Sequence, residues 1–452
     1  MGRIDDLARA LERGRRQYEE LMASQEWVDF APEERYDLRQ SRLPEDPGKE
    51  GDRHQLRLDA FGGEEESREA TGEPQPERGR IGAGDNLDYM VWLLKDQDLK
   101  GKLQLIYVDP PFFSGARYQA SVQLQTEKLG KSDILKAGAY SDRWEGDLEN
   151  YLQMLAVRFY LMREMLSDTG ILWVHLDWHG AHVVKLMLDE IFGEERFVNE
   201  VIWTYKSGGA GKRSFAKKHD TLLAYSKTGD YTFHPLKEKS YNREGKPYRF
   251  KGVEEFEDEG GWYTMVNMKD VWTIDMVGRT SKERMGYATQ KPEKLVERIV
   301  ESCSDPGDLC ADFFAGTGTL GVVCAKMDRR WIMCDEGSVA VADQILRMAS
   351  REGAFTVERP QTGPVRPEPT EESKIFPRAD VDSEGGYVYL SGYHPDMSLV
   401  RREDRETVFW YLSEDRLCLI RFWSVDQEKG DDSVHRSRRL LAGGDVCPLN
   451  PP

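Results

Sequence analysis

Residues 103 to 112 read LQLIYVDPPF and constrain the fold of this chain more than any other segment. The run is apolar and stops at two prolines, which is typical of a buried parallel strand that ends in a loop. Tyr151 to Leu166 carries apolar residues at helical spacing, residues 171 to 176 have the pattern of a second strand, and His182 to Phe192 have that of a second helix. This alternation predicts an α/β sheet with parallel strands.

A further α/β unit begins near residue 290. Helical spacing runs from Pro292 to Cys303, and Asp308 to Phe314 leads into the turn Ala315-Gly-Thr-Gly-Thr. A helix to Met327 and a strand at 330 to 335 complete the unit. Between the two units, residues 201 to 288 lose this periodicity and are rich in Gly, Lys, Arg, Tyr and Trp, which predicts an inserted module.

The loop Asp109-Pro110-Pro111-Phe112 suits chemistry on an amino group. An amino group conjugated to an aromatic ring is a poor nucleophile, because its lone pair is delocalised. The Asp109 carboxylate and the Pro110 carbonyl can accept its two N–H bonds and concentrate that lone pair on nitrogen. Prolines stiffen the loop, and Phe112 offers a stacking surface for a flipped base. Since Asp-Pro-Pro is also a common strand terminator, a plain turn is the alternative.

The segment from Asp312 to Thr319 has the features of a nucleoside-binding turn. Gly316 and Gly318 would let a ligand approach the backbone closely, and Asp335, 17 residues after Gly318, can hold ribose hydroxyls at the end of the next strand. A dinucleotide-binding fold is the competing interpretation. The third glycine of that fingerprint is absent, and Gly-x-Gly alone is a weak signal.

A net charge of −18 opposes nucleic-acid binding unless the cations are clustered. Residues 201 to 219 contain no acidic residue, and Trp203, Tyr205 and Phe215 lie among their cations. A solvated loop is the alternative explanation for such a run. The cations of this stretch are Lys206, Lys212, Arg213, Lys217 and Lys218.

The segments taken together resemble the β-group of N4/N6 amino DNA methyltransferases, especially the modification subunits of type III restriction systems. The resemblance covers about residues 80 to 345. In that family the catalytic loop precedes the cofactor loop, with a target-recognition region between them. The resemblance rests on Gly84 to Leu87, the Asp-Pro-Pro-Phe loop, Thr169 to Asp177, Glu190 to Trp203, Thr289 to Leu295 and Asp312 to Thr319.

The resemblance implies a Rossmann-like fold that binds S-adenosylmethionine. Asp335 would bind its ribose, and Lys291 would pair with its carboxylate at the methionine end. Family members often carry Tyr where this chain has Phe112 and Pro where it has Phe313. The residues expected at the cofactor are Asp85, Gln290, Lys291, Pro292, Asp312, Phe314, Gly316, Gly318, Thr319 and Asp335.

The same resemblance implies a site-specific DNA methyltransferase acting on N6 of adenine. N4 of cytosine is the alternative target, although Ser-Pro-Pro is the commoner loop in that branch. The sequence also leaves open a catalytically inactive DNA-binding subunit and a Rossmann oxidoreductase. Expected partners are double-stranded DNA, a second copy of the chain and a restriction nuclease subunit. Phosphate contacts are expected from the cations of residues 201 to 219 and from Arg243, Lys246 and Arg249.

Two further candidates have structural explanations. His175 and Asp177 could suggest a metal or a general base, but no third ligand is spaced to complete a metal site, so a structural or substrate-positioning role is expected. Trp144 would wall the base pocket or belong to the core. No apolar run is long enough to span a membrane, and the cysteines form no Cys-x-x-Cys pair. A cytoplasmic protein without a metal is therefore expected.

These patterns predict six segments. They are an N-terminal helix with a flexible polar stretch (1–80), a catalytic half (81–200), a target-recognition insert (201–288), a cofactor-binding half (289–350), a linker (351–376) and a small β-containing C-terminal module of unknown role (377–452).

Overall fold

A computed structural model describes most of the chain. The described residues are 2–38, 55–57, 77–126, 131–361, 378–384, 387–394, 422–426 and 434–440, apart from 143, 145–147, 208–212, 244, 279, 288 and 352. Lys212, most of the predicted linker and most of the N-terminal polar stretch lie outside these residues.

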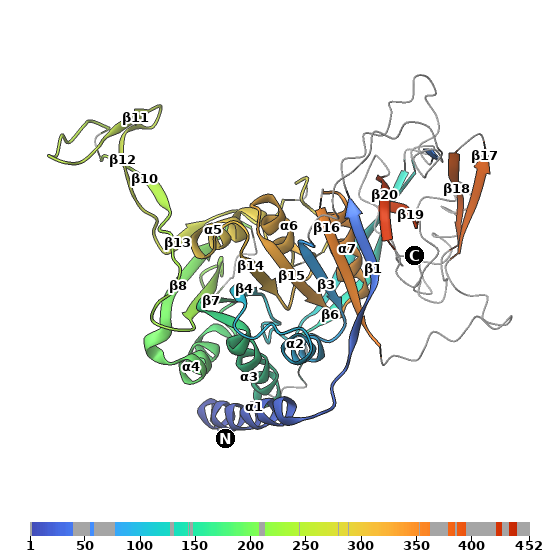
Figure 1. Cartoon of the computed structure of the whole chain (residues 1–452). Helices are drawn as coiled ribbons and strands as arrows, with labels where there is room; N and C mark the ends of the chain where they lie inside the picture. Colours follow the sequence, from blue (N-terminus) through green and yellow to red (C-terminus); the bar gives the residue numbers. More distant parts are fainter. Residues whose placement is uncertain are drawn as a thin grey trace.

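The central element is one large sheet (Figure 1). The six strands from β7 to β16 in the spatial order run parallel to one another, as predicted. β9 runs antiparallel to both β7 and β8, and β1 runs antiparallel to β16 but parallel to β20. Within the described residues the order is β13 (Val271–Thr273), β8 (Phe197–Thr204), β9 (His219–Ser226), β7 (Leu166–Leu176), β4 (Leu103–Val108), β14 (Leu309–Asp312), β15 (Arg330–Asp335), β3 (Gly79–Ala83), β16 (Gly353–Pro360), β1 (Phe30–Leu38), β20 (Val434–Leu440) and β19 (Phe422–Asp426).

Helices cover both faces of this sheet. On β4, Ile106 and Val108 pack into one helical layer, while Leu105 and Tyr107 pack into the other, because successive side chains of a strand point to opposite faces. This arrangement confirms the predicted Rossmann-like architecture. The first layer holds α1 (Arg3–Ala23), α2 (Asn86–Lys95), α3 (Leu148–Met165) and α4 (Ala181–Phe192), and the second holds α5 (Glu293–Cys303), α6 (Thr319–Lys326) and α7 (Ser338–Ala349).

The predicted insert of residues 201 to 288 is smaller in the structure. β9 is buried in the central sheet between β7 and β8, because its apolar run Leu222-Leu-Ala-Tyr225 packs with the core. A separate antiparallel sheet is formed by β10 (Lys237–Tyr241), β12 (Gly261–Asn267) and β11 (Phe256–Asp258). It projects from the sheet as an arm beyond β13 (Figure 1).

The other predicted boundaries also shift. β16 extends the central sheet to Pro360, so the linker expected from residue 351 begins later, and β1 brings part of the N-terminal segment into the same sheet. A hairpin of β5 (Arg117–Thr126) and β6 (Lys131–Ser141) interrupts the catalytic half. β2 (Gln55–Arg57) pairs with β18 (Tyr387–His394), beside β17 (Arg378–Glu384). Among the described residues, no helix is long and apolar enough to cross a membrane.

Candidate active site

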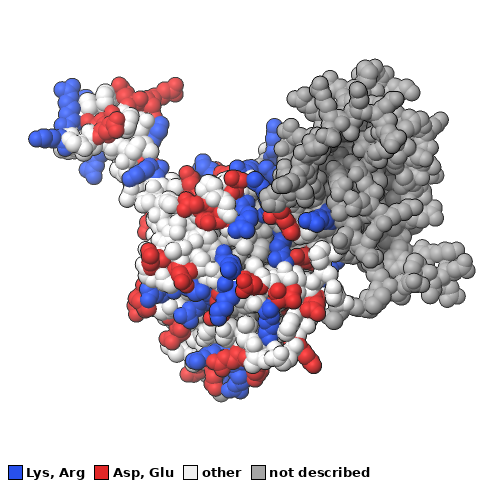
Figure 2. Space-filling view, viewed as in Figure 1, with Lys and Arg blue, Asp and Glu red and all other residues white. Residues whose placement is uncertain are grey.

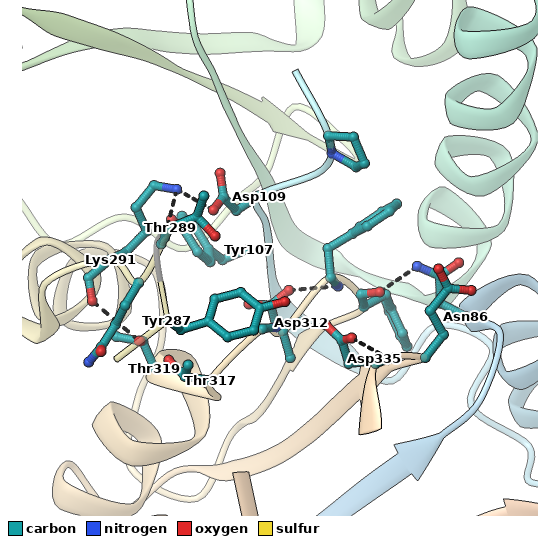
Figure 3. A pocket seen from close by; sticks show the side chains of 18 of the residues that line it. Asn86, Tyr107, Asp109, Tyr287, Thr289, Lys291, Asp312, Thr317, Thr319 and Asp335 are labelled. Carbon is teal, nitrogen blue, oxygen red and sulfur yellow. Dashed lines mark hydrogen bonds and ion pairs between the residues drawn. The ribbon is translucent and has the colours of Figure 1, made fainter. Parts of the chain in front are cut away.

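The Asp-Pro-Pro-Phe loop and the glycine turn open into one cavity of about 690 Å³ (Figure 3). β4, β14 and β15 are parallel neighbours, so the loops that follow them meet at the carboxyl edge of the sheet, where open α/β sheets bind ligands. The volume lies within the range of roughly 300–1,000 Å³ that is typical of small-molecule sites. Of the predicted residues, Asp85, Asp109, Pro111, Gln290, Lys291, Asp312, Phe314, Gly316, Thr319 and Asp335 line it.

Asp109 lines this cavity, and its two carboxylate oxygens have different surroundings. Its Oδ2 forms an ion pair with the Lys291 ammonium, which also lies 5.3 Å from the centre of the Phe112 ring. Its Oδ1 is buried and has no hydrogen-bond partner among the described residues. A buried acceptor without a donor is costly, so this oxygen is suited to receive an N–H or O–H group from a ligand.

The loop after Asp109 is fixed by Asp142, which is 1% exposed. Asp142 accepts hydrogen bonds from the backbone N–H groups of Phe113 (3.0 Å) and Ser114 (2.6 Å). It also accepts bonds from the Ser114 hydroxyl (2.6 Å) and the Trp144 indole (3.2 Å). Phe113 has a φ of 63°, which is strained for a side chain of its size. The Asp142 bonds hold the loop in this conformation.

Phe112 rests against a buried polar chain. Its ring stacks on His175, with 6.0 Å between ring centres. The His175 ring lies 2.9 Å from the Tyr107 hydroxyl and 3.2 Å from Asp220, to which Tyr205 also donates. Burial opposes ionisation of Asp220, but the bonds from His175 and Tyr205 outweigh it and lower the pKa of that carboxyl. His175 therefore supports Phe112.

Asp177 does not join His175. Its carboxylate lies 2.7 Å from the His179 ring in the turn after β7. Across the described residues, no group of His, Cys, Asp and Glu side chains has the geometry of a metal site.

Two carboxylates shape the glycine turn. Asp335 accepts bonds from the backbone N–H groups of Gly316 (2.9 Å) and Gly337 (2.8 Å), and burial raises its pKa to about 6. Asp312 accepts from the N–H of Phe314 (2.9 Å), and burial raises its pKa well above the usual range. Both carboxylates therefore anchor the turn as well as lining the cavity.

Four predicted residues do not line the cavity. They are Pro110, Phe112, Gly318 and Pro292. Gly318 is the N-cap of α6 in the left-handed conformation, and Pro292 is the N-cap of α5. Gln290 lines it, but its side-chain amide bonds the Glu283 carbonyl (2.5 Å) and the Met285 N–H (2.8 Å). Gln290 therefore fixes the loop that carries Lys291.

Several cavity residues were missed by sequence reasoning. Arg158, buried on α3, donates to Asn86 (2.6 Å) and Asp85 (3.2 Å), and Asn86 donates to the Phe313 carbonyl (2.5 Å). This chain of bonds joins the start of α2 to the glycine turn. An arginine among the apolar positions of a predicted helix was the available signal. Tyr287 also lines the cavity. Its sequence context carried no signal for this role beyond its position just before Thr289-Gln-Lys.

The predicted DNA contacts separate into two groups. β8 runs parallel to β7, because both are antiparallel to β9. The end of β8 and the start of β9 therefore lie at the same edge of the sheet as the catalytic loop. The residues of this edge group are Lys206, Arg213, Lys217 and Lys218.

The second group, Arg243, Lys246 and Arg249, lies on the arm. The arm is rooted where Met268 donates to the Leu236 carbonyl (2.8 Å), just before β13. Since β13 is parallel to β8, this root lies at the opposite edge of the sheet. Figure 2 shows both basic and acidic side chains on the arm. One ion pair on the arm joins Lys239 to Asp258 (2.5 Å).

Comparison with known proteins identifies the family of the part of the chain that forms this cavity. A model of the N6/N4 DNA methylase family matches residues 103–345, which include both loops. The chain belongs to this family.

The relatives of this methylase include restriction-modification enzymes. It is 27% identical over 308 residues to the type II methyltransferase M.EcaI of Enterobacter cloacae, covering 55% of this chain and 65% of that protein. It is 26% identical over 235 residues to M2.DpnII of Streptococcus pneumoniae, covering 52% and 77%. A type III Mod subunit, StyLTI of Salmonella typhimurium, is 29% identical over 154 residues, covering 32% of this chain and 23% of the subunit.

A solved structure similar to the methylase is the PvuII DNA methyltransferase, described as cytosine-N4-specific. The two are 17% identical with a TM-score of 0.40, over 61% of this chain and 87% of that one.

Proposed function

We propose that this methylase transfers a methyl group from S-adenosylmethionine to N6 of adenine at a specific site in duplex DNA. The observation that carries the proposal is the buried Oδ1 of Asp109, which has no donor among the described residues and belongs to a side chain that lines the same cavity as the glycine turn. An acceptor in this position is suited to an amino group that must lose its conjugation with a ring.

The cavity fits such a cofactor. Asp335 is held by two backbone N–H groups at the end of β15, in the position from which a carboxylate can bind ribose hydroxyls. A Cβ on Gly316 would meet only Tyr287, at 4.0 Å, so the described backbone of the turn is open to a ligand. When bound, the cofactor supplies a methyl group on a sulfonium.

The catalytic loop would act on the target base. Asp109 would accept a hydrogen bond from one N–H of the amino group, which makes the nitrogen lone pair available for direct displacement. The Pro110 carbonyl, expected from the sequence to accept the other N–H, is not among the residues that line the cavity. Asp142 and His175 keep the loop and Phe112 in place, which reduces reorganisation during the reaction. The four described cysteines are buried, and the displacement requires no covalent intermediate on the enzyme.

Lys291 has a different partner from the one expected. The resemblance implies a bond to the cofactor carboxylate, but the Lys291 ammonium is paired with Asp109. We therefore assign Lys291 to holding the Asp109 carboxylate in place through Oδ2. The ammonium has three N–H donors, so a cofactor carboxylate could bind beside this ion pair.

The target base and the partners are part of the same proposal. Aspartate at the first position of the loop favours adenine, since serine is the commoner residue in the cytosine branch. Similarity to a type III Mod subunit over 32% of this chain supports a restriction nuclease partner. A homodimer stays a prediction from the sequence.

Sequencing of modified DNA tests the target. We expect the full chain, expressed in cells without adenine methylation, to place N6-methyladenine at one recurring sequence, whereas cells expressing an Asp109→Ala variant should show none. N4-methylcytosine at a recurring sequence would overturn the choice of base. DNA without either modification, together with no transfer of tritiated methyl by the purified chain, would overturn the proposed function.

Replacing Gly316 with leucine should weaken cofactor binding by at least about tenfold, or roughly 1.4 kcal/mol. The new side chain would project into the cavity, where Tyr287 is the one described neighbour within reach of its Cβ. Calorimetric titration with S-adenosylmethionine measures the effect.

Gly307→Leu is the matched control for this variant. Gly307 also has a positive φ, 88° against 49° for Gly316, and no described atom lies within 4 Å of its Cβ position, but it lies away from the cavity. Both variants therefore carry backbone strain, and only Gly316→Leu should lose affinity. Equal affinities in the two folded variants would mean that the cofactor binds elsewhere.

A further inference from the structure

Two exposed aromatic side chains lie at the edge of the sheet that carries the catalytic loop. They are Phe215, in the loop between β8 and β9, and Trp178, in the turn after β7, and together they are called the patch. Phe215 is 99% exposed and Trp178 is 42% exposed. Burial of a phenylalanine side chain away from water is favourable. The free chain does not gain this stabilisation, because Phe215 is exposed. A partner that covers Phe215 would gain it on binding.

The turn that carries Trp178 lies next to the catalytic loop. The turn after β7 includes Gly180, at which a Cβ would lie 3.6 Å from the Phe112 carbonyl oxygen. Phe112 itself stacks on His175 of β7. The loop that carries Phe215 reaches the same turn, because the Lys217 ammonium lies 3.4 Å from the centre of the Trp178 ring. Phe215 therefore belongs to the edge of the sheet at which a target base would enter.

Charge at the patch favours a polyanion. Arg213, Lys217 and Lys218 surround Phe215 in sequence, and residues 201 to 219 contain no acidic residue. The acidic side chain of the neighbouring turn, Asp177, is bonded to His179. A fully exposed aromatic ring within a cationic loop combines the two features that bind stacked bases and their phosphates.

We infer that Phe215 inserts into duplex DNA and fills the space left in the base stack by the flipped target base, an inference that rests on the proposed function. The contact between Lys217 and Trp178 ties the loop that carries Phe215 to the turn after β7. Flipping a base costs free energy, because its stacking and pairing are lost. An apolar side chain inserted between base steps offsets part of that cost.

Two duplexes that contain the recognition sequence test this role, one fully paired and one with a mismatch at the target base. The mismatch lowers the cost of flipping. Phe215→Ala should therefore reduce single-turnover methyl transfer about tenfold or more on the paired duplex, but about twofold or less on the mismatched one. Phe215→Trp should retain most of the rate on both. The fluorescence of 2-aminopurine at the target position should rise less with Phe215→Ala than with the wild type.

Phe233→Ala is the matched control, because Phe233 is another exposed phenylalanine (41%) and lies near the root of the arm. It should change neither rate. A Phe215→Ala variant that is equally slow on both duplexes, or normal on both, would overturn the inference while leaving the proposed function intact. So would a wild-type dimer that Phe215→Ala converts to a monomer. A wild-type chain inactive on both duplexes would overturn the proposed function and this inference together.

Discussion

Asp109→Ala is expected to lower the rate of methyl transfer by about a hundredfold to a thousandfold, the usual effect of removing one preorganised group at the reacting atoms. Asp109 Oδ1 would accept an N–H bond that strengthens as the amino group loses its conjugation. The cofactor would contact the glycine turn and Asp335, so its affinity should stay within about twofold, a change of less than roughly 0.4 kcal/mol. Calorimetry and a tritiated-methyl assay measure the two quantities separately.

The ion pair with Lys291 requires a second variant. Removal of one partner of a buried pair leaves the other uncompensated and costs about 3–5 kcal/mol of stability, so we expect Asp109→Ala to unfold at a lower temperature. Asp109→Asn keeps the shape and one oxygen acceptor but removes the charge. We expect it to bind cofactor normally and to be slow. A folded Asp109→Ala variant that retains more than about a tenth of the wild-type rate, a barrier change below roughly 1.4 kcal/mol, would contradict the role.

The sequence predicted those elements whose signal is local. β4 and β15 are short apolar runs buried on both faces, and α5 has a regular apolar stripe, so periodicity was sufficient to identify them. The Asp109 loop and the glycine turn were identified because each follows such a strand. Their meeting in one cavity follows from parallel pairing, since the carboxyl ends of neighbouring parallel strands lie at one edge.

The rest depends on contacts between residues that are distant in the sequence. Asp142 reaches the catalytic loop only because the β5–β6 hairpin returns the chain to Ala116, whose carbonyl accepts from the Asp142 N–H (2.9 Å). Arg158 lies 72 residues from Asn86, to which it donates. β1 contains Pro32 and several charged residues, so its composition did not suggest a strand of the main sheet. No local pattern specifies any of these partners.

The position of β9 changes the interpretation of the basic residues. The sequence placed residues 201 to 288 in one insert, with two basic stretches as candidate phosphate contacts. The structure inserts β9 into the sheet and thereby divides them between two edges. The edge group lies beside the catalytic loop and includes an ion pair, Lys206 with Asp275 (3.4 Å). The arm carries several acidic side chains among its basic ones, including Glu255 and Asp258. We therefore favour the edge group for contact with phosphates.

A comparison of two triple variants decides between these surfaces. The first variant changes Lys206, Arg213 and Lys217 to Ala. It should bind every DNA sequence more weakly to the same extent, and the slope of its log affinity against log salt should be smaller. Each lost phosphate contact reduces that slope by about 0.9 for duplex DNA, so three contacts give about 2.7. Lys218 is kept, because its ammonium donates to the Lys206 carbonyl (2.6 Å) and fixes the loop.

The matched variant changes Arg243, Lys246 and Arg249 to Ala, which removes the same charge from the arm. Its salt slope should stay close to that of the wild type. Target preference should survive in the first variant, because phosphate contacts position a protein without reading bases. A salt slope that falls only in the arm variant would place the DNA along the opposite edge of the sheet. That result would also remove the charge argument for Phe215, since the loop between β8 and β9 would then be a solvated loop.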